Sequence, residues 1–388
     1  MSIISLDKEY VAGTYGRFPV ELVSGKGSVL TGSDGKQYID MGTGIGVNSF
    51  GAADDVWVSA VTAQLGKLQH ASNLYYTEPC ALLAKALCEK TGMKKVFFSN
   101  SGAEANECAI KVARKYSAQK KGSDCYTIVT LVNSFHGRTL TTLAATGQDK
   151  FHADFQPLTP GFVHVAADDI EGLKKTVAEV NAAGIMLECV QGEGGVLPLS
   201  REFILAAAQL AKEQDIPLII DEVQTGNGRT GKFYAYMHYG ISPDIVSTAK
   251  GLGGGLPLGA TLMSEKVQNV LGPGDHGSTF GGNPVSCAGA LSIVKRLDDA
   301  LLADVQAKSA YIFSTLENAP GVKSVKGLGL MIGIKTKKDA KEVVNACLEK
   351  GVLCLTAKDK VRLLPALNIP MDVLKSAVEV IKSACAEA

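Results

Sequence analysis

Short apolar runs alternate with amphipathic stretches through the middle of the chain, from about residue 95 to residue 263. Short runs rich in Val, Ile, Phe and Tyr are typical of buried strands, and apolar residues three and four apart are typical of helices. The pattern predicts helices at Glu104–Lys120, Ile170–Asn181 and Arg201–Glu213 and strands at Lys95–Ser99, Tyr126–Val132, Ile185–Val190, Ile216–Asp221, Ile245–Thr248 and Gly259–Met263. This alternation indicates right-handed crossovers and an α/β fold with a mostly parallel central sheet.

The two ends of the chain have patterns of their own. A turn rich in Gly and Asp separates strand candidates at Ser28–Thr31 and Gln37–Met41. Past Pro284 the pattern favours helices at Ala288–Leu297, Leu301–Leu316 and Val373–Ala384, with β-like pieces at Leu328–Ile334 and Val361–Leu364. We expect residues 46–284 to form a large domain, and residues 1–45 and 285–388 to form a smaller α+β domain together.

Composition excludes several classes of protein. The formal net charge of the 388 residues is zero and no block of like charges occurs, which argues against nucleic acid or a membrane surface as partner. The nine cysteines contain no C-x-x-C pair, so they predict neither a disulfide framework nor a zinc site. The amino terminus becomes charged too early for a signal peptide, and no apolar run is long enough to span a bilayer. We expect a cytoplasmic protein without a metal.

Lys250 stands where an apolar run meets a glycine cluster, in Asp244-Ile-Val-Ser-Thr-Ala-Lys-Gly-Leu-Gly-Gly-Gly255. A lysine in a crowded, partly dry site should have a lowered pKa, which favours the amine nucleophile. Asp221 ends the preceding strand candidate, where a carboxylate can keep a pyridine ring nitrogen protonated. Together the two residues predict a pyridoxal 5'-phosphate enzyme with Lys250 as its Schiff-base lysine.

A phosphate site is predicted at the turn Ser99-Asn-Ser-Gly-Ala-Glu-Ala-Asn106, which lies between a strand and a helix. Small residues there let backbone amides approach an anion, and the helix dipole favours a phosphate. An ordinary helix cap by Ser101 would need similar residues. The loop Gly277-Ser-Thr-Phe-Gly-Gly-Asn-Pro284 offers two further hydroxyls, although such loops are often only loops.

Three blocks could contact the ring or the substrate. In Ser134-Phe-His-Gly-Arg-Thr139, Phe135 could stack on a pyridine ring and Arg138 could clamp a carboxylate. His136 is either a general base or, more commonly for such a residue, a structural histidine. The remaining candidates are Val223 on the ring face, Gln224 near the phenolic oxygen, Glu193 among glycines, and Arg362, for which a surface position is the default. Asp221 and Glu222 could suggest a metal, but no third ligand follows at ligand spacing.

The blocks S-G-A-E-A-N, S-F-H-G-R-T, Q-G-E-G-G, D-E-V-Q-T-G-x-G-R-T-G, K-G-L-G-G-G and G-S-T-F-G-G-N-P, in this order, resemble the class III aminotransferases of fold type I. The resemblance extends from Tyr10 to the carboxyl terminus. It is greatest to the enzymes that move the terminal amino group of N2-acetyl-L-ornithine to 2-oxoglutarate in bacterial arginine synthesis. This chain departs from the family in having Ala103 where Thr is frequent, and Cys189 where Pro is usual.

The resemblance implies a role for each matching residue. Lys250 would be the Schiff-base lysine and proton carrier, and Glu193 would neutralise Arg362 until glutamate binds. A homodimer with shared active sites is implied, because Thr279 would reach the phosphate from a neighbouring subunit. The implied cofactor site is Gly102, Ala103, Phe135, Asp221, Glu222, Val223, Gln224, Lys250 and Thr279, and the implied substrate site is Tyr15, Arg138, Glu193, Ser278 and Arg362.

Other functions stay open at this point. Another ω-amine could be the substrate, namely ornithine, succinyl-diaminopimelate or 4-aminobutyrate. Arg138 argues against 4-aminobutyrate, which has no α-carboxylate besides the one at its far end. A protein that binds pyridoxal phosphate without catalysis is the alternative from a different class.

Overall fold

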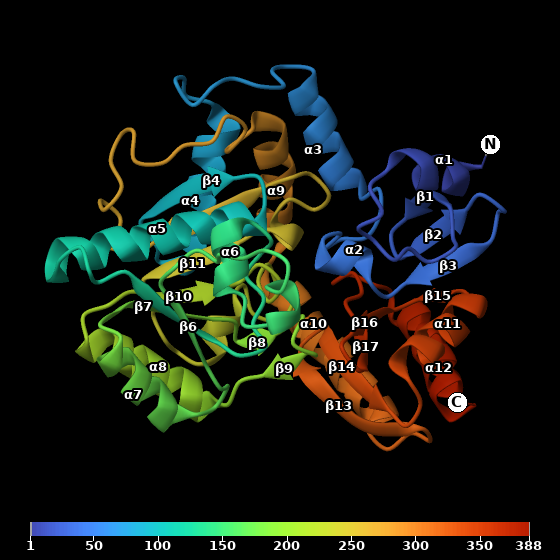
Figure 1. The fold of residues 1–388 in the computed structure, drawn as a ribbon. Coiled ribbons are helices and arrows are strands. Elements are labelled where there is room, and N and C mark those ends of the chain that lie inside the picture. The colour runs from blue at the N-terminus through green and yellow to red at the C-terminus, as the bar shows by residue number, and fades with distance from the viewer. Residues whose placement is uncertain (1, 388) are drawn as a thin grey trace.

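A seven-stranded sheet forms the centre of the protein, whose computed structural model describes residues 2–387 (Figure 1). Its strand order is β4-β12-β11-β10-β7-β5-β6, and β12 runs antiparallel to both neighbours while the others are parallel. The mostly parallel α/β sheet is therefore confirmed. The strands are β4 (Lys95–Ser99), β5 (Thr127–Leu131), β6 (Phe162–Val165), β7 (Ala182–Leu187), β10 (Leu218–Asp221), β11 (Ile245–Thr248) and β12 (Gly259–Met263).

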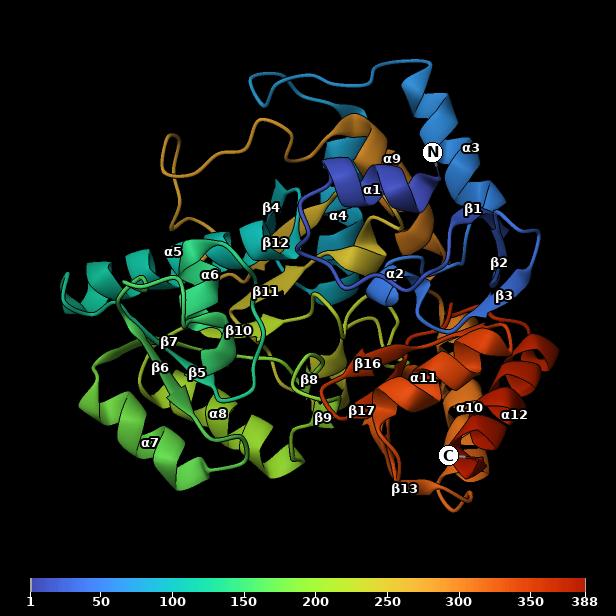
Figure 2. The same cartoon turned by 45° about the vertical axis from the view of Figure 1, so that its right-hand side comes forward.

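Helices cover both faces of this sheet. Successive strand residues point to opposite faces, so Ile219 packs in one apolar cluster while Leu218 and Ile220 pack in another. Helix α5 (Gly102–Lys121) contributes to the cluster of Ile219. Helices α7 (Ile170–Glu179) and α8 (Arg201–Glu213) contribute to the other cluster, and both views show them on the side of the sheet away from α5 (Figures 1 and 2). Burial on both faces explains why the strands are nearly continuous apolar runs.

The two ends of the chain meet in space. Val352 of β15 pairs with Ile39 of β3, so a carboxyl-terminal strand joins the amino-terminal hairpin in one sheet. The blue and red ribbons lie side by side in both views (Figures 1 and 2). This sheet is β1 (Leu22–Lys26), β2 (Val29–Gly32), β3 (Gln37–Asp40) and β15 (Val352–Leu353).

A second sheet and three helices complete the carboxyl-terminal region. The piece expected at Leu328–Ile334 is the tip of a hairpin, because two residues turn the chain between β13 and β14. The sheet order is β13 (Val322–Leu328), β14 (Met331–Thr336), β17 (Lys360–Leu363) and β16 (Leu355–Ala357). The helices are α10 (Asp299–Leu316), α11 (Ala340–Glu349) and α12 (Met371–Ala386).

Several elements were not predicted from the sequence. The helix expected from Ala288 begins earlier, because Asn283 caps it and Pro284 takes the first turn. The helix expected from Ala288 is α9 (Pro284–Arg296). The other elements of the fold are α1 (Ile3–Tyr10), α2 (Thr43–Gly46), α3 (Asp55–Leu65), α4 (Glu78–Thr91), α6 (Leu140–Ala145), β8 (Val190–Gln191) and β9 (Leu197–Pro198), with short 3-10 turns at Asp149–Phe151, Ala235–His238 and Lys250–Leu252.

All nine cysteines are free thiols, and seven of them are buried. Within residues 2–387, no helix is both long and apolar enough to cross a membrane. The same residues contain no group of three or more His, Cys, Asp or Glu side chains that could hold a metal ion.

Candidate active site

A cavity of about 450 Å³ lies at the edge where the parallel strands end. Doubly wound sheets place ligands at this edge because the loops that follow the strands meet there. Asp221 ends β10, Lys250 follows β11, and Phe135 follows β5. Of the residues predicted from the sequence, those on the cavity wall are Gly102, Ala103, Phe135, Arg138, Glu193, Asp221, Val223, Gln224 and Lys250.

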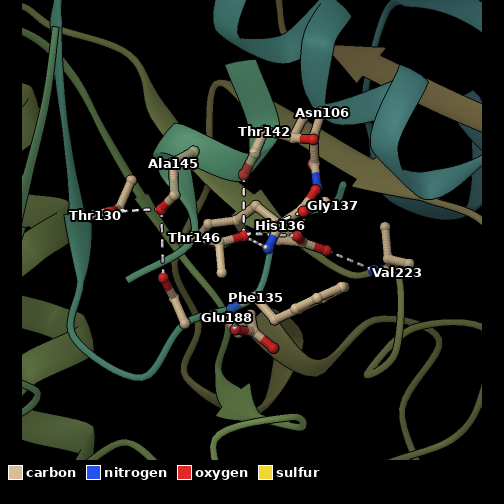
Figure 3. Close-up of polar contacts among 12 residues, drawn as sticks. Asn106, Thr130, Phe135, His136, Gly137, Thr142, Ala145, Thr146, Glu188 and Val223 are labelled. Carbon is tan, nitrogen blue, oxygen red and sulfur yellow. Dashed lines mark hydrogen bonds and ion pairs between the residues drawn. The ribbon is translucent and has the colours of Figure 1, made fainter. Parts of the chain in front are cut away.

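The carboxylate of Asp221 is buried and held from three sides. Its Oδ1 accepts from the amide of Val223 at 2.9 Å, and its Oδ2 accepts from Asn106 Nδ2 at 2.8 Å. His136 Nδ1 lies 2.8 Å from the same Oδ2, and Figure 3 shows His136 between Asn106 and Thr146. The structure thus places His136 as a buried partner of Asp221. Asn106 was not predicted, although it stands one helical turn into α5 from Gly102 in the same sequence block.

Lys250 has the environment that the sequence predicts. Burial lowers the pKa of its ammonium, and the positive charge of Arg362 lowers it further. The carboxylates of Glu193 and Asp221 oppose this shift without cancelling it. An amine with a lowered pKa is available as a nucleophile and as a proton carrier near neutral pH.

The amino terminus of α5 forms the other end of the cavity. The amides of Gly102 and Ala103 belong to the first helical turn and have no intrahelical acceptor. A Cβ on Gly102 would lie 2.6 Å from Cγ1 of Val223, so this close approach requires glycine. Ser101 caps the helix by accepting from the amide of Glu104 at 3.2 Å. The helix cap is therefore confirmed, and it leaves the first two amides open to an anion, so the phosphate site stays a prediction.

Glu193, Gln224 and Arg362 form a connected group beside Lys250. Arg362 is buried rather than on the surface, and its Nη1 donates to Glu193 Oε1 and, at 3.2 Å, to Gln224 Oε1. Gln224 Nε2 donates to Glu193 Oε1 at 3.2 Å. Burial alone would raise the pKa of Glu193, but Arg362 holds it below its ordinary value. Glu193 is therefore ionised and paired at neutral pH.

Two acidic groups near the site differ from the sequence predictions. Glu188 was given no role there, and Glu222, which was assigned to the cofactor site, does not line the cavity. Glu188 lines the cavity, where its Oε1 accepts from the amide of Phe135 at 2.9 Å and its Oε2 from the amide of Gly192 at 3.1 Å. Glu222 turns away from the cavity and accepts from Thr225 Oγ1 at 2.6 Å and from the amide of Tyr236 at 2.9 Å. Burial raises the pKa of each carboxyl group to about 7.

Tyr15, Ser278 and Thr279 lie outside the cavity wall, and Arg138 lies at its exposed rim. Tyr15 is 72% exposed in the segment before β1. Thr279 is also exposed, and Ser278 accepts from Asn100 Nδ2 at 3.2 Å. Arg138 is exposed at the mouth, where its guanidinium lies over the ring of Phe151 at 4.1 Å from the ring centroid.

Known proteins are similar to this chain along nearly its whole length. The sequence profile of the family described as aminotransferase class-III matches residues 10–385. The chain belongs to the class III aminotransferases. The acetylornithine aminotransferase of Haemophilus ducreyi is 52% identical to it over 387 residues, which cover 99% of this chain and 98% of that protein.

Two solved structures show that the fold of this class III aminotransferase is the fold type I of its relatives. Ornithine aminotransferase from Toxoplasma gondii matches with a TM-score of 0.94 and 30% identity, covering 98% of this chain and 94% of the other. N-acetylornithine aminotransferase from Stenotrophomonas maltophilia matches with a TM-score of 0.86 and 33% identity, covering 99% of both chains.

Class III aminotransferases depend on pyridoxal 5'-phosphate, and the residues present fit this cofactor. The cavity volume is in the range that small-molecule sites occupy. Its wall offers an amine with a lowered pKa at Lys250, open helix amides for a phosphate, and a buried carboxylate at Asp221. These are the three groups that the aldehyde, the phosphate and the ring nitrogen of the cofactor require.

Proposed function

We propose that this class III aminotransferase transfers the terminal amino group of N2-acetyl-L-ornithine to 2-oxoglutarate in arginine biosynthesis. The products are N-acetyl-L-glutamate 5-semialdehyde and L-glutamate. The observation that carries the proposal is the 52% identity, over nearly the whole of both chains, to an acetylornithine aminotransferase.

The proposed roles are those that the family resemblance implies, and the positions of the side chains support them. Held by Lys250, the cofactor would supply an electron sink for the carbon that loses its proton. Once released from the cofactor, the Lys250 amine would take that proton and return it to the neighbouring carbon. Asp221 would keep the ring nitrogen protonated, while His136 and Asn106 hold the Asp221 carboxylate in place. Phe135 and Val223 would hold the ring, and the amides of Gly102 and Ala103 would hold the phosphate.

Glu193 and Arg362 would let one cavity accept two differently charged substrates. While N-acetylornithine is bound, Glu193 neutralises Arg362, as it does in this structure. When glutamate binds, Glu193 moves away and Arg362 pairs with the side-chain carboxylate of the substrate. We assign the α-carboxylate to Arg138, with Ser278 and Tyr15 nearby.

Ornithine is the second candidate, since the Toxoplasma ornithine aminotransferase has the higher TM-score of the two solved relatives. The charges at the mouth favour the acetylated substrate. Arg138 and Lys150 both lie over the ring of Phe151, at 4.1 and 4.6 Å from its centroid. Two cations at this point repel the α-ammonium of ornithine, whereas acetylation removes that charge and leaves the α-carboxylate.

The test is a comparison of kcat/KM for N-acetylornithine, ornithine and 4-aminobutyrate in the wild-type protein and in Arg138→Ala. We expect N-acetylornithine to be the best amine, and Arg138→Ala to lower its kcat/KM about tenfold or more, because a charge-assisted bidentate contact is lost. A higher kcat/KM for ornithine than for N-acetylornithine, or an unchanged kcat/KM in Arg138→Ala, would refute the proposal.

Lys250→Ala tests the role of the lysine. In this variant we expect turnover to vanish together with the near-visible absorbance of the attached cofactor. Lys174→Ala is the matched control, because Lys174 is an exposed lysine of α7.

We further propose a cytoplasmic homodimer in which Thr279 completes the phosphate site of the partner subunit. The free thiols support a reducing compartment. Exposed apolar side chains support the dimer: Tyr76 is fully exposed and Phe280, next to Thr279, is 60% exposed. Asn73 Nδ2 ties the two segments together by donating to the carbonyl oxygens of Ser278 and Gly281, both at 2.9 Å. Residues 46–284 would form the cofactor domain, and residues 1–45 with 285–388 the smaller one.

A further inference from the structure

The turn that carries Glu193 is fixed at several backbone atoms. It joins β8 to β9, and the amides of Gly195 and Val196 both bond to the carbonyl oxygen of Gly192. The amide of Gly192 donates to Glu188 Oε2 at 3.1 Å. Gly195 has a φ of 113°, which favours glycine, so the chain reverses sharply just after Glu193.

Lys360 holds the far end of this turn from another part of the chain. It lies on β17, two residues before Arg362, so both side chains point to the same face of that strand. Its Nζ donates to the carbonyl oxygen of Gly195 at 2.7 Å. One strand therefore contacts the turn twice, through Lys360 at its backbone and through Arg362 at the carboxylate of Glu193.

The environment of Lys360 is unusual for a lysine. The side chain is buried, and its partner is a neutral carbonyl oxygen. The adjacent acid, Asp359, is paired with Lys335 instead. Burying an ammonium without a carboxylate costs stability, and an apolar side chain of similar length would avoid this cost. A contribution to function, rather than to stability, would account for a lysine at this position.

We propose that Lys360 is a positioning residue for substrate exchange, which holds the Gly192–Gly195 backbone so that Glu193 moves as a side chain alone. This inference rests on the proposed function of Glu193 and Arg362. The side chain of Glu193 is 29% exposed, and that of Arg362 is 4% exposed. With the backbone fixed, rotation of Glu193 frees Arg362 for the carboxylate of glutamate while Arg362 stays in place.

Loss of the Lys360 contact affects the two half-reactions differently. With N-acetylornithine bound, the ion pair between Glu193 and Arg362 persists and can reform even on a loosened turn. With glutamate bound, a loosened turn lets the Glu193 carboxylate return to Arg362 and compete with the substrate. The glutamate half-reaction should therefore suffer selectively.

The experiment uses the holoenzyme and follows the cofactor absorbance in single-turnover reactions with each amino donor. Lys360→Met should lower the apparent second-order rate constant for L-glutamate about tenfold, and that for N-acetylornithine less than twofold. Lys335→Met is the matched control, because Lys335 pairs in register with Lys360 on β14. Its rates should stay unchanged. Equal loss in both half-reactions, or no loss in either, would overturn the inference.

Amide hydrogen exchange gives a readout that does not depend on catalysis. Exchange over residues 190–198 should accelerate about fivefold in Lys360→Met and not in Lys335→Met, and unchanged exchange would overturn the inference. If Lys360→Met does not fold, Lys360→Gln, which ends short of the Gly195 carbonyl, is held to the same outcomes. A wild-type protein that reacts with neither donor would refute the proposed function instead.

Discussion

His136 Nδ1 lies 2.8 Å from Asp221 Oδ2, and both side chains are buried beside the candidate cofactor cavity. Asn106 Nδ2 ties the pair together, because it donates both to Asp221 Oδ2 and to the carbonyl oxygen of His136. The three residues come from α5, from the loop after β5, and from the end of β10. The carboxylate is thus fixed by elements that the sheet itself holds in place, as a preorganised electrostatic site requires.

Asp221→Asn keeps the shape of the side chain and removes its charge. We expect kcat to fall about 10²- to 10³-fold, because the ring nitrogen loses the anion that keeps it protonated. The measurement is kcat at saturating concentrations of N-acetylornithine and 2-oxoglutarate. Asp169→Asn, at the cap of α7, is the control and should keep kcat within about twofold. A near-wild-type kcat in Asp221→Asn would refute the assigned role.

Glu193→Gln tests the charge switch directly. The amide cannot neutralise Arg362, so an uncompensated positive charge remains beside the alkyl chain of N-acetylornithine. We expect kcat/KM for N-acetylornithine to fall about tenfold, a modest figure for a truncated ion pair because Glu193 is partly exposed. The KM for glutamate should stay the same or decrease, since the Glu193 carboxylate no longer competes with the substrate for Arg362. Parallel losses for both substrates would argue against a switch.

Much of the cavity wall was predictable from the sequence, because several of its residues stand directly after buried strands. Lys250 and Asp221 follow apolar runs whose burial on both faces leaves a clear pattern. The contact between Asn106 and Asp221 joins residues 115 positions apart, and no local periodicity reports it. Helix α3 was missed for a different reason: Trp57 packs against the core while Val56 and Val58 on other sides of the helix are exposed, so no single apolar stripe marks it. The Arg362 contact likewise depends on tertiary packing, which made a lone arginine resemble a surface residue.

The proposed dimer predicts different effects for two adjacent residues. Phe280→Asp places a charge in an apolar interface and should shift the protein to a monomer in sedimentation velocity, with loss of bound cofactor. Thr279→Ala should stay dimeric and weaken cofactor binding about tenfold, because one hydroxyl contact to the phosphate is lost. Leu205→Asp, on the exposed side of α8, is the control and should change neither property. A dimeric Phe280→Asp protein would place the interface elsewhere.

Glu222 predicts a pH dependence of stability that one substitution should remove. Burial raises the pKa of its carboxyl group to about 7 in the folded protein, from an ordinary value of 4.5. The folded state therefore binds the proton more tightly than the unfolded state, so this contribution to stability is complete below about pH 4.5 and is lost as pH rises through about 7. The contribution of Glu222 to the free energy of unfolding changes by roughly 3 kcal/mol across this pH range.

Glu222→Gln mimics the protonated group and can keep its contacts with Thr225 and the amide of Tyr236. We expect the variant to match the wild-type free energy of unfolding at pH 5 and to exceed it at pH 8, by up to roughly 3 kcal/mol. Urea unfolding at pH 5, 6, 7 and 8 measures this difference, and subtracting the two curves cancels the other titrating groups. A difference that is constant with pH would show that Glu222 stays ionised throughout, with its hydrogen bonds compensating the burial of the charge.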